Sequence, residues 1–151
     1  MKKIASFCVD HDKINAGIYI SRIDGDITTF DLRTRKPNAG AYMDNVTMHS
    51  VEHMLATLLR NGEIGGNVIY FGPMGCRTGF YLLTRDLAPH TVFAALKKAL
   101  ADTLAHEGPI FGATRVECGN YLELDLEAAK RECAAYLDVL NEYKGDFSYE
   151  Q

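Results

Sequence analysis

The run His49-Ser50-Val51-Glu52-His53 constrains this chain more than any other stretch of its sequence. On a helix, residues three and four apart lie on the same side, so His49, Glu52 and His53 would share one face. This H-x-x-E-H order predicts a divalent metal with an acid/base group beside it. The plainer alternative is that the two histidines are ordinary polar residues of an amphipathic helix.

The residues around this run predict the helix itself. Asp44 or Asn45 can cap its start, and it extends to about Asn61. A core stripe forms without either histidine, from Val51, Leu55, Leu58 and Leu59. A separate polar face contains His49, Glu52, His53, Ala56 and Arg60. This separation favours a functional interpretation of the histidines.

Two histidines are an incomplete ligand set, and the four cysteines are candidates for the third ligand. Cys8, Cys76, Cys118 and Cys133 lie too far apart to form a C-x-x-C knuckle or a recognisable disulfide framework. Such usage is typical of a reduced, cytosolic protein. Cys118 lies in a glycine-marked turn from which its thiol can reach a site, whereas Cys133 falls in a helical pattern and is expected in the core.

Cys76 lies between Gly75 and Arg77 in the segment 73–79, which contains two glycines. Glycines let the backbone approach a ligand closely. A thiol beside Arg77, and beside any neighbouring metal, would be favoured as thiolate for proton transfer or nucleophilic attack. The alternative for this segment is a tight turn with a buried free cysteine.

Several separated motifs together resemble the S-ribosylhomocysteine lyase (LuxS) family of autoinducer-2 synthases. They occur in the family's order over nearly the whole chain: Ser6 to His11, Phe30 to Arg33 with Pro37-Asn38, His49 to His53, Pro73 to Tyr81, Cys118-Gly119, and Asp125 to Lys130. The combination is far more specific than any single motif. The resemblance implies the fold of that family, which is related to the processing-peptidase-like metallohydrolases.

The resemblance also implies roles for individual residues. His49, His53 and Cys118 would bind one divalent metal and leave a fourth position open, with Fe(II) favoured and Zn(II) or Co(II) possible. Cys76 and Glu52 match the family's proton-transfer pair. Three further residues match positions around the substrate: Ser6, His11 and Arg33. The implied assembly is a homodimer with active sites at the subunit interface.

The implied reaction cleaves S-ribosyl-L-homocysteine to L-homocysteine and 4,5-dihydroxy-2,3-pentanedione, the autoinducer-2 precursor. A sugar carbonyl must first migrate toward the thioether, and β-elimination then expels the sulfur. The metal would act as a Lewis acid, while Cys76 and Glu52 would move the protons.

The chain departs from the family pattern near the expected substrate site. Tyr70 stands where many relatives have an acidic residue suited to the amino acid end of the substrate. Thr34 and Arg35 replace phenylalanine and cysteine, and Asn15-Ala16-Gly17 replaces an alanine-proline turn. These changes bear on substrate contacts, while every metal and proton-transfer position is kept.

Composition and patterning predict one α+β domain over residues 1–151. Strands are expected at 18–23 and 27–32, joined by a hairpin at Asp24-Gly25-Asp26, and again near 67–71 and 80–84. Helices are expected at about 89–106 and 126–143, with a frayed segment after Gly145. This order favours an antiparallel sheet with helices packed on one face.

The charge and hydropathy patterns exclude some classes of partner. A net charge of −4 argues against a broad nucleic-acid surface. The absence of a long apolar run and of a signal-peptide pattern predicts a cytoplasmic protein without a membrane partner.

Two other functions fit the metal motif. A metallopeptidase would use Glu52 to activate a metal-bound water. A metal-stabilised binding protein would instead ligate the metal fully, with a residue such as Cys76 as fourth ligand, and would catalyse nothing.

Overall fold

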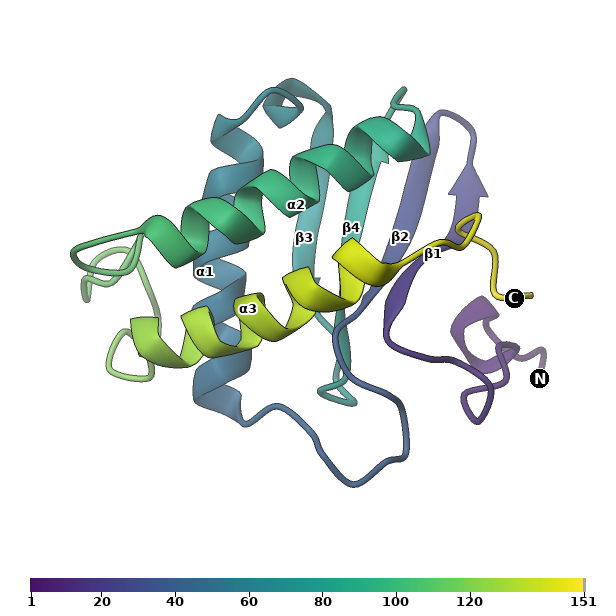
Figure 1. Cartoon of the computed structure of the whole chain (residues 1–151), viewed down its shortest axis with the longest axis horizontal. Helices are drawn as coiled ribbons and strands as arrows, with labels where there is room; N and C mark the ends of the chain where they lie inside the picture. Colours follow the sequence, from purple (N-terminus) through teal and green to yellow (C-terminus); the bar gives the residue numbers. More distant parts are fainter. Residues whose placement is uncertain (151) are drawn as a thin grey trace.

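The computed structural model describes residues 1–150 as a two-layer α+β domain (Figure 1). Its strands are β1 (Gly17–Asp24), β2 (Ile27–Arg33), β3 (Val68–Pro73) and β4 (Gly79–Arg85). Its α-helices are α1 (Asn45–Asn61), α2 (Pro89–Ala105) and α3 (Leu126–Glu142). Short 3-10 turns lie at Ala5–Phe7 and Gly65–Asn67. The fold class and the order of elements predicted from the sequence are confirmed.

The sheet is antiparallel throughout, in the order β1-β2-β4-β3. The turn between β1 and β2 contains Gly25 at φ +62°, a left-handed conformation that glycine adopts without strain. In Figure 1 the helices lie together on one side of the sheet. The strand residues that pack beneath them are fully buried: Ile18, Phe30, Leu32, Phe80 and Leu82.

The opposite face of the sheet carries polar and aromatic side chains. Asp31 pairs with Tyr19 on one side and with Tyr81 on the other, and Arg33 follows two residues later. Successive strand residues point to opposite faces, so alternation with Phe30 and Leu32 brings these polar groups together. The segment before β1 also reaches this face, because Ser6 and Tyr81 line one cavity.

Helix α1 forms as the sequence predicts. Asp44 is its N-cap, and its carboxylate accepts a hydrogen bond of 2.7 Å from the backbone N–H of Thr47. The buried residues of α1 are Ser50, Val51, Met54, Leu55 and Leu59. Leu58, expected in the core stripe, is half-buried at the edge of a groove against α2.

The segment after α3 is ordered against the sheet, so the prediction that it frays is wrong. Phe147 is only 5% exposed. Its carbonyl accepts a hydrogen bond of 2.7 Å from the backbone N–H of Ile20 in β1, and its own N–H donates to the hydroxyl of Tyr143 at 2.9 Å. An aromatic anchor and a sheet-edge hydrogen bond therefore hold residues 143–150 in place.

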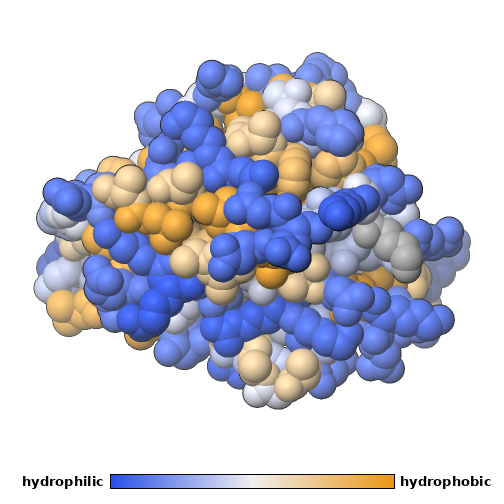
Figure 2. Space-filling model, viewed as in Figure 1, coloured by the Kyte–Doolittle hydropathy of each residue, from blue (hydrophilic) through white to orange (hydrophobic). Residues whose placement is uncertain are grey.

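The helical side of the molecule presents a mostly hydrophilic surface with apolar side chains interspersed (Figure 2). Across residues 1–150, none of the helices combines the length and the apolarity needed to cross a membrane.

Candidate active site

Helix α1 and the loop between α2 and α3 form a candidate metal centre. The ligand atoms of His49, His53 and Cys118 all lie within 4.8 Å of one another. Cys118 Sγ lies 3.4 Å from His49 Nε2. The i, i+4 spacing places both imidazoles on one face of α1, and the loop brings the thiol to them from 65 or more residues away in the chain.

Backbone carbonyls fix the orientation of both imidazoles. His49 Nδ1 lies 3.1 Å from the carbonyl oxygen of Glu123, and His53 Nδ1 lies 2.8 Å from that of Phe111. A carbonyl oxygen can only accept, so each Nδ1 carries the hydrogen, and Nε2 is the nitrogen that has the lone pair in the neutral ring. This arrangement orients imidazoles for metal binding.

Gly112 gives His53 the room that this orientation needs. It adopts φ +71°, and a Cβ built there would lie 3.2 Å from His53 Nδ1. A side chain at this position would press on the ring at the nitrogen that donates to Phe111. The loop between α2 and α3 therefore leaves space for the His53 ring and also supplies Cys118.

The donor set fits a divalent transition metal. Cys118 is half-buried and free, and its sulfur accepts a hydrogen bond of 3.4 Å from the backbone N–H of Asn120. Two neutral imidazoles and one thiolate form a mixed nitrogen and sulfur set that suits iron, cobalt or zinc. Within residues 1–150 the cluster contains three ligands, which is the number found in catalytic sites that keep one position open.

Glu52 lies half-buried on α1, directly before His53. In the described part of the chain its carboxylate makes no hydrogen bond or ion pair. A carboxylate that is not engaged elsewhere, on the helix that supplies two candidate metal ligands, is a candidate for proton exchange with a group bound there.

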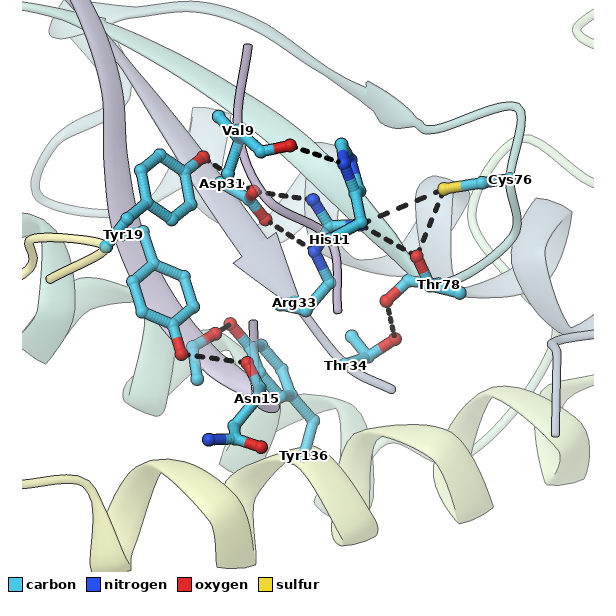
Figure 3. A network of polar contacts seen from close by, with 12 residues as sticks. Val9, His11, Asn15, Tyr19, Asp31, Arg33, Thr34, Cys76, Thr78 and Tyr136 are labelled. Carbon is cyan, nitrogen blue, oxygen red and sulfur yellow. Dashed lines mark hydrogen bonds and ion pairs between the residues drawn. The ribbon is translucent and has the colours of Figure 1, made fainter. Parts of the chain in front are cut away.

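Cys76 lies in the turn between β3 and β4, where two side chains contact its exposed sulfur. Its Sγ lies 3.0 Å from Thr78 Oγ1 and 3.8 Å from Arg33 Nη1, and the same Nη1 donates to Thr78 at 2.8 Å. Figure 3 shows these three side chains joined at the end of the strands. The cation that contacts the thiol is therefore Arg33. Arg77, which the sequence suggested for this role, instead lies over the ring of Tyr42 at 5.9 Å.

Asp31 holds Arg33 in place. Its carboxylate accepts hydrogen bonds of 3.0 and 2.6 Å from Arg33 Nε and Nη2 (Figure 3). The two residues are only 1% and 2% exposed. Burial opposes the charge on Arg33, but the bidentate contact with Asp31 outweighs it, and the pKa of Arg33 is raised. The guanidinium therefore stays charged beside Cys76.

A cavity of about 450 Å³ opens at Cys76. It contains all three residues expected around the substrate, and its lining includes Ser6, Phe7, His11, Arg33, Asn38, Tyr42, Cys76, Thr78 and Tyr81. His11 Nδ1 lies 2.9 Å from the carbonyl oxygen of Val9, a contact that fixes the orientation of its ring (Figure 3). The first segment of the chain and the turn after β3 thus build one site.

The expected site residues fall into two groups within one chain. The cavity at Cys76 has none of His49, His53, Cys118 or Glu52 in its lining. The metal centre in turn contains neither Cys76 nor Arg33. Cys76, the residue suggested as a fourth ligand under the binding-protein alternative, is not part of the ligand cluster within one chain.

The positions that depart from the family pattern also have places in the structure. Thr34 donates a hydrogen bond of 3.3 Å to the Thr78 carbonyl, and Arg35 forms a bidentate ion pair with Glu132 of α3 at 3.0 and 2.7 Å. Tyr70 lines a neighbouring cavity of about 340 Å³ that shares Ser6 and Tyr81 with the first. Tyr70 thus lies in a cavity next to the one at Cys76 and is not among the residues that line the latter.

Sequence reasoning missed the residues that support Cys76. Asp31 precedes Arg33 by two residues on a strand, so strand periodicity alone would have placed both on one face. Thr78 follows Cys76 by two residues, within the glycine-containing segment 73–79. No local signal pointed to Tyr149, whose hydroxyl donates to Asp31 at 2.7 Å from 118 residues away.

Comparison with known proteins adds a family to this geometry. Residues 4–146 match the family described as S-Ribosylhomocysteinase (LuxS). The chain is 43% identical to the S-ribosylhomocysteine lyase of Borreliella afzelii (strain PKo) over 150 residues, which cover 95% of this chain and 96% of that protein. It is 44% identical to the S-ribosylhomocysteine lyase of Finegoldia magna (strain ATCC 29328 / DSM 20472 / WAL 2508) over 149 residues, or 95% of each chain.

Proposed function

Since the chain belongs to the S-ribosylhomocysteinase (LuxS) family, we propose that it cleaves S-ribosyl-L-homocysteine to L-homocysteine and 4,5-dihydroxy-2,3-pentanedione. The observation that carries the proposal is the convergence of His49, His53 and Cys118 in a chain of this family. The metallopeptidase alternative has no comparable support, because the similar proteins are named as lyases.

One divalent metal, with Fe(II) favoured, would be held by His49, His53 and Cys118. When bound, it supplies Lewis-acid polarisation of a sugar oxygen. Glu123 and Phe111 contribute their carbonyls, which keep each imidazole in the tautomer that leaves Nε2 free.

Cys76 is the proposed base and acid for protons on carbon. Arg33 stays charged at 3.8 Å from Sγ, while Thr78 at 3.0 Å limits where the sulfur can point. Glu52 is the proposed group for protons on oxygen, because it belongs to the same helix as His49 and His53 and directly precedes His53 in the chain. Ser6 and His11 would orient the sugar within the cavity that they line.

The reaction requires the sugar carbonyl to move from C1 to C2 and then to C3. At each shift Cys76 takes a proton from the carbon that becomes the carbonyl and returns it to the carbon that was the carbonyl, and Glu52 moves the hydroxyl protons. With the carbonyl at C3, removal of the C4 proton forms a C4–C5 double bond as the C5–S bond breaks. The electron pair leaves with sulfur as homocysteine thiolate, which takes up a proton, and the enol product becomes the diketone.

The complete active site is proposed to form between two copies of the chain. One copy would contribute the Cys76 cavity and the other its metal centre, because these groups are separate in a single chain. Apolar side chains around the cavity are exposed and suit a dimer contact: Ile4, Phe7 and Tyr70. Four free cysteines suit the reduced environment of the cytoplasm.

Anaerobic turnover of S-ribosylhomocysteine by the iron-loaded protein tests this function. Released thiol is measured alongside bound iron for the wild type, Cys76→Ala and His49→Ala. The wild type should release thiol, Cys76→Ala should keep iron but lose about a hundredfold or more in rate, and His49→Ala should lose both.

The absence of thiol release from a fully metallated wild type would contradict the proposal. Near-normal turnover by Cys76→Ala would leave the lyase activity intact but refute the role assigned to the cysteine.

A further inference from the structure

The segment after α3 contacts the buried ion pair beneath Cys76. Tyr149 donates a hydrogen bond of 2.7 Å to Asp31 Oδ2, and its ring stacks on Tyr19 with centroids 5.0 Å apart and an interplanar angle of 17°. Phe147, buried two residues earlier, anchors the segment to β1. The hydroxyl is thus held against the carboxylate by the ring and by the backbone.

This hydroxyl completes the hydrogen bonding of Asp31. Arg33 donates one hydrogen bond to each carboxylate oxygen, and Tyr149 adds a second donor to Oδ2. Burial, together with the charge of Asp31, raises the pKa of Tyr149, so the phenol remains a donor at neutral pH. A buried carboxylate with all three donors in place has one preferred orientation.

The orientation of Asp31 fixes that of Arg33, and Arg33 reaches the reacting cysteine. Nε and Nη2 of the planar guanidinium bind Asp31, so the direction of Nη1 follows from that pair. Nη1 is the atom that donates to Thr78 and lies 3.8 Å from Cys76 Sγ. Figure 3 shows Asp31, Arg33, Thr78 and Cys76 in one continuous series of contacts.

We propose that Tyr149 is a positioning residue for Cys76, acting through Asp31 and Arg33. The proposal rests on the role assigned to Cys76 above. Tyr149 does not line the cavity at Cys76, so it influences the thiol only by holding the ion pair beneath it.

Tyr149→Phe tests the proposal in the full-length protein, since it removes the hydroxyl and keeps the ring on Tyr19. Glu150→Gln is the matched control, because it changes the next residue without touching Asp31. Wild type and variants are treated briefly with iodoacetamide, and alkylation of Cys76 and Cys8 is quantified in separate peptides by mass spectrometry. Cys8 is exposed, and within residues 1–150 the one hydrogen bond of its thiol goes to the Ile4 carbonyl, so it serves as the internal reference.

Loss of one hydrogen bond to a charged group should slow Cys76 alkylation relative to Cys8 about threefold to tenfold in Tyr149→Phe. The kcat for thiol release should fall by about the same factor, with KM changed less than about twofold. Glu150→Gln should match the wild type in both measurements. Bound iron and the melting temperature are recorded to show that the variants are folded and metallated.

An unchanged ratio of Cys76 to Cys8 alkylation in Tyr149→Phe, and also in Tyr149→Ala, would overturn the proposal even if the melting temperature fell. The alkylation measurement does not depend on turnover. If it slows as expected while the metallated wild type releases no thiol, the positioning role stands and the proposed lyase function fails.

Discussion

At the scale of single residues, the candidate site depends on side chains that hold other side chains. Cys76 is an exposed residue, and the two side chains that contact its sulfur come from β2 and from its own turn. Thr78 has the central place among them, since it is buried and contacts both Arg33 and Cys76. Substitutions at Thr78 can therefore distinguish the contribution of its side-chain volume from that of its hydrogen bonds.

Thr78→Val keeps the volume of the side chain and removes its hydroxyl. It leaves one buried donor of Arg33 unpaired, which costs about 1–3 kcal/mol. We expect kcat/KM for thiol release to fall roughly tenfold. Thr78→Ser is the matched variant and should keep most of the activity. Equal loss in both variants would show that packing, and not the hydroxyl, is what matters.

At the scale of elements, one helix and one loop form the metal centre. Helix α1 supplies two ligands by its own periodicity, whereas the loop between α2 and α3 must be held in one path to deliver Cys118. That loop has two glycines with positive φ, Gly108 and Gly112, and only the second lies against a metal ligand. Substituting each glycine in turn therefore distinguishes the effect of backbone strain, common to both, from the effect of contact with His53, which occurs only at Gly112.

Gly112→Ala should weaken metal binding about tenfold to a hundredfold, because its Cβ presses on His53 and disturbs the bond to Phe111. Gly108→Ala imposes similar strain at φ +95° but meets no atom within 4 Å. It should lower stability while leaving metal affinity near the wild-type value. Metal titration against a competing chelator, with thermal unfolding alongside, measures both effects.

The N-cap of α1 makes stability depend on pH. Hydrogen bonds from Thr47 lower the pKa of Asp44, so its carboxylate stabilises the fold above the pKa of an unfolded aspartate. This contribution is lost as the pH falls through the lowered value. In urea unfolding at neutral pH, Asp44→Ala should cost about 1 kcal/mol. Asp44→Asn keeps an acceptor and should lose less stability than the wild type on acidification; an equal loss would contradict the assignment.

At the scale of the whole molecule, local patterns predicted the elements and tertiary contacts decided the site. The hairpin at Gly25, the helix with His49 and His53, and the two-layer arrangement all follow from periodicity and turn residues. Pairing the thiol with Arg77 was wrong because neighbours in sequence need not be neighbours in space. Arg33 lies 43 residues away and reaches Cys76 only through the pairing of β2 with β4.

The proposed dimer predicts that two inactive variants can restore activity when they assemble with each other. His49→Ala and Cys76→Ala are each expected to be inactive. If each site combines the metal centre of one copy with the cysteine of the other, co-expressed variants should regain roughly a quarter of wild-type activity, since half of the dimers are mixed and each has one intact site. No recovery from purified mixed dimers would place both groups in a single chain.

The bond from Ile20 to Phe147 has a consequence beyond the active site. β1 is an edge strand, and edges with unpaired backbone groups invite strand addition by other chains. Here the Ile20 N–H is already engaged, and a bulge between Ile20 and Arg22 interrupts the regular ladder beside it. The segment after α3 therefore also protects the protein against edge-to-edge aggregation, so shortening it would affect solubility as well as catalysis.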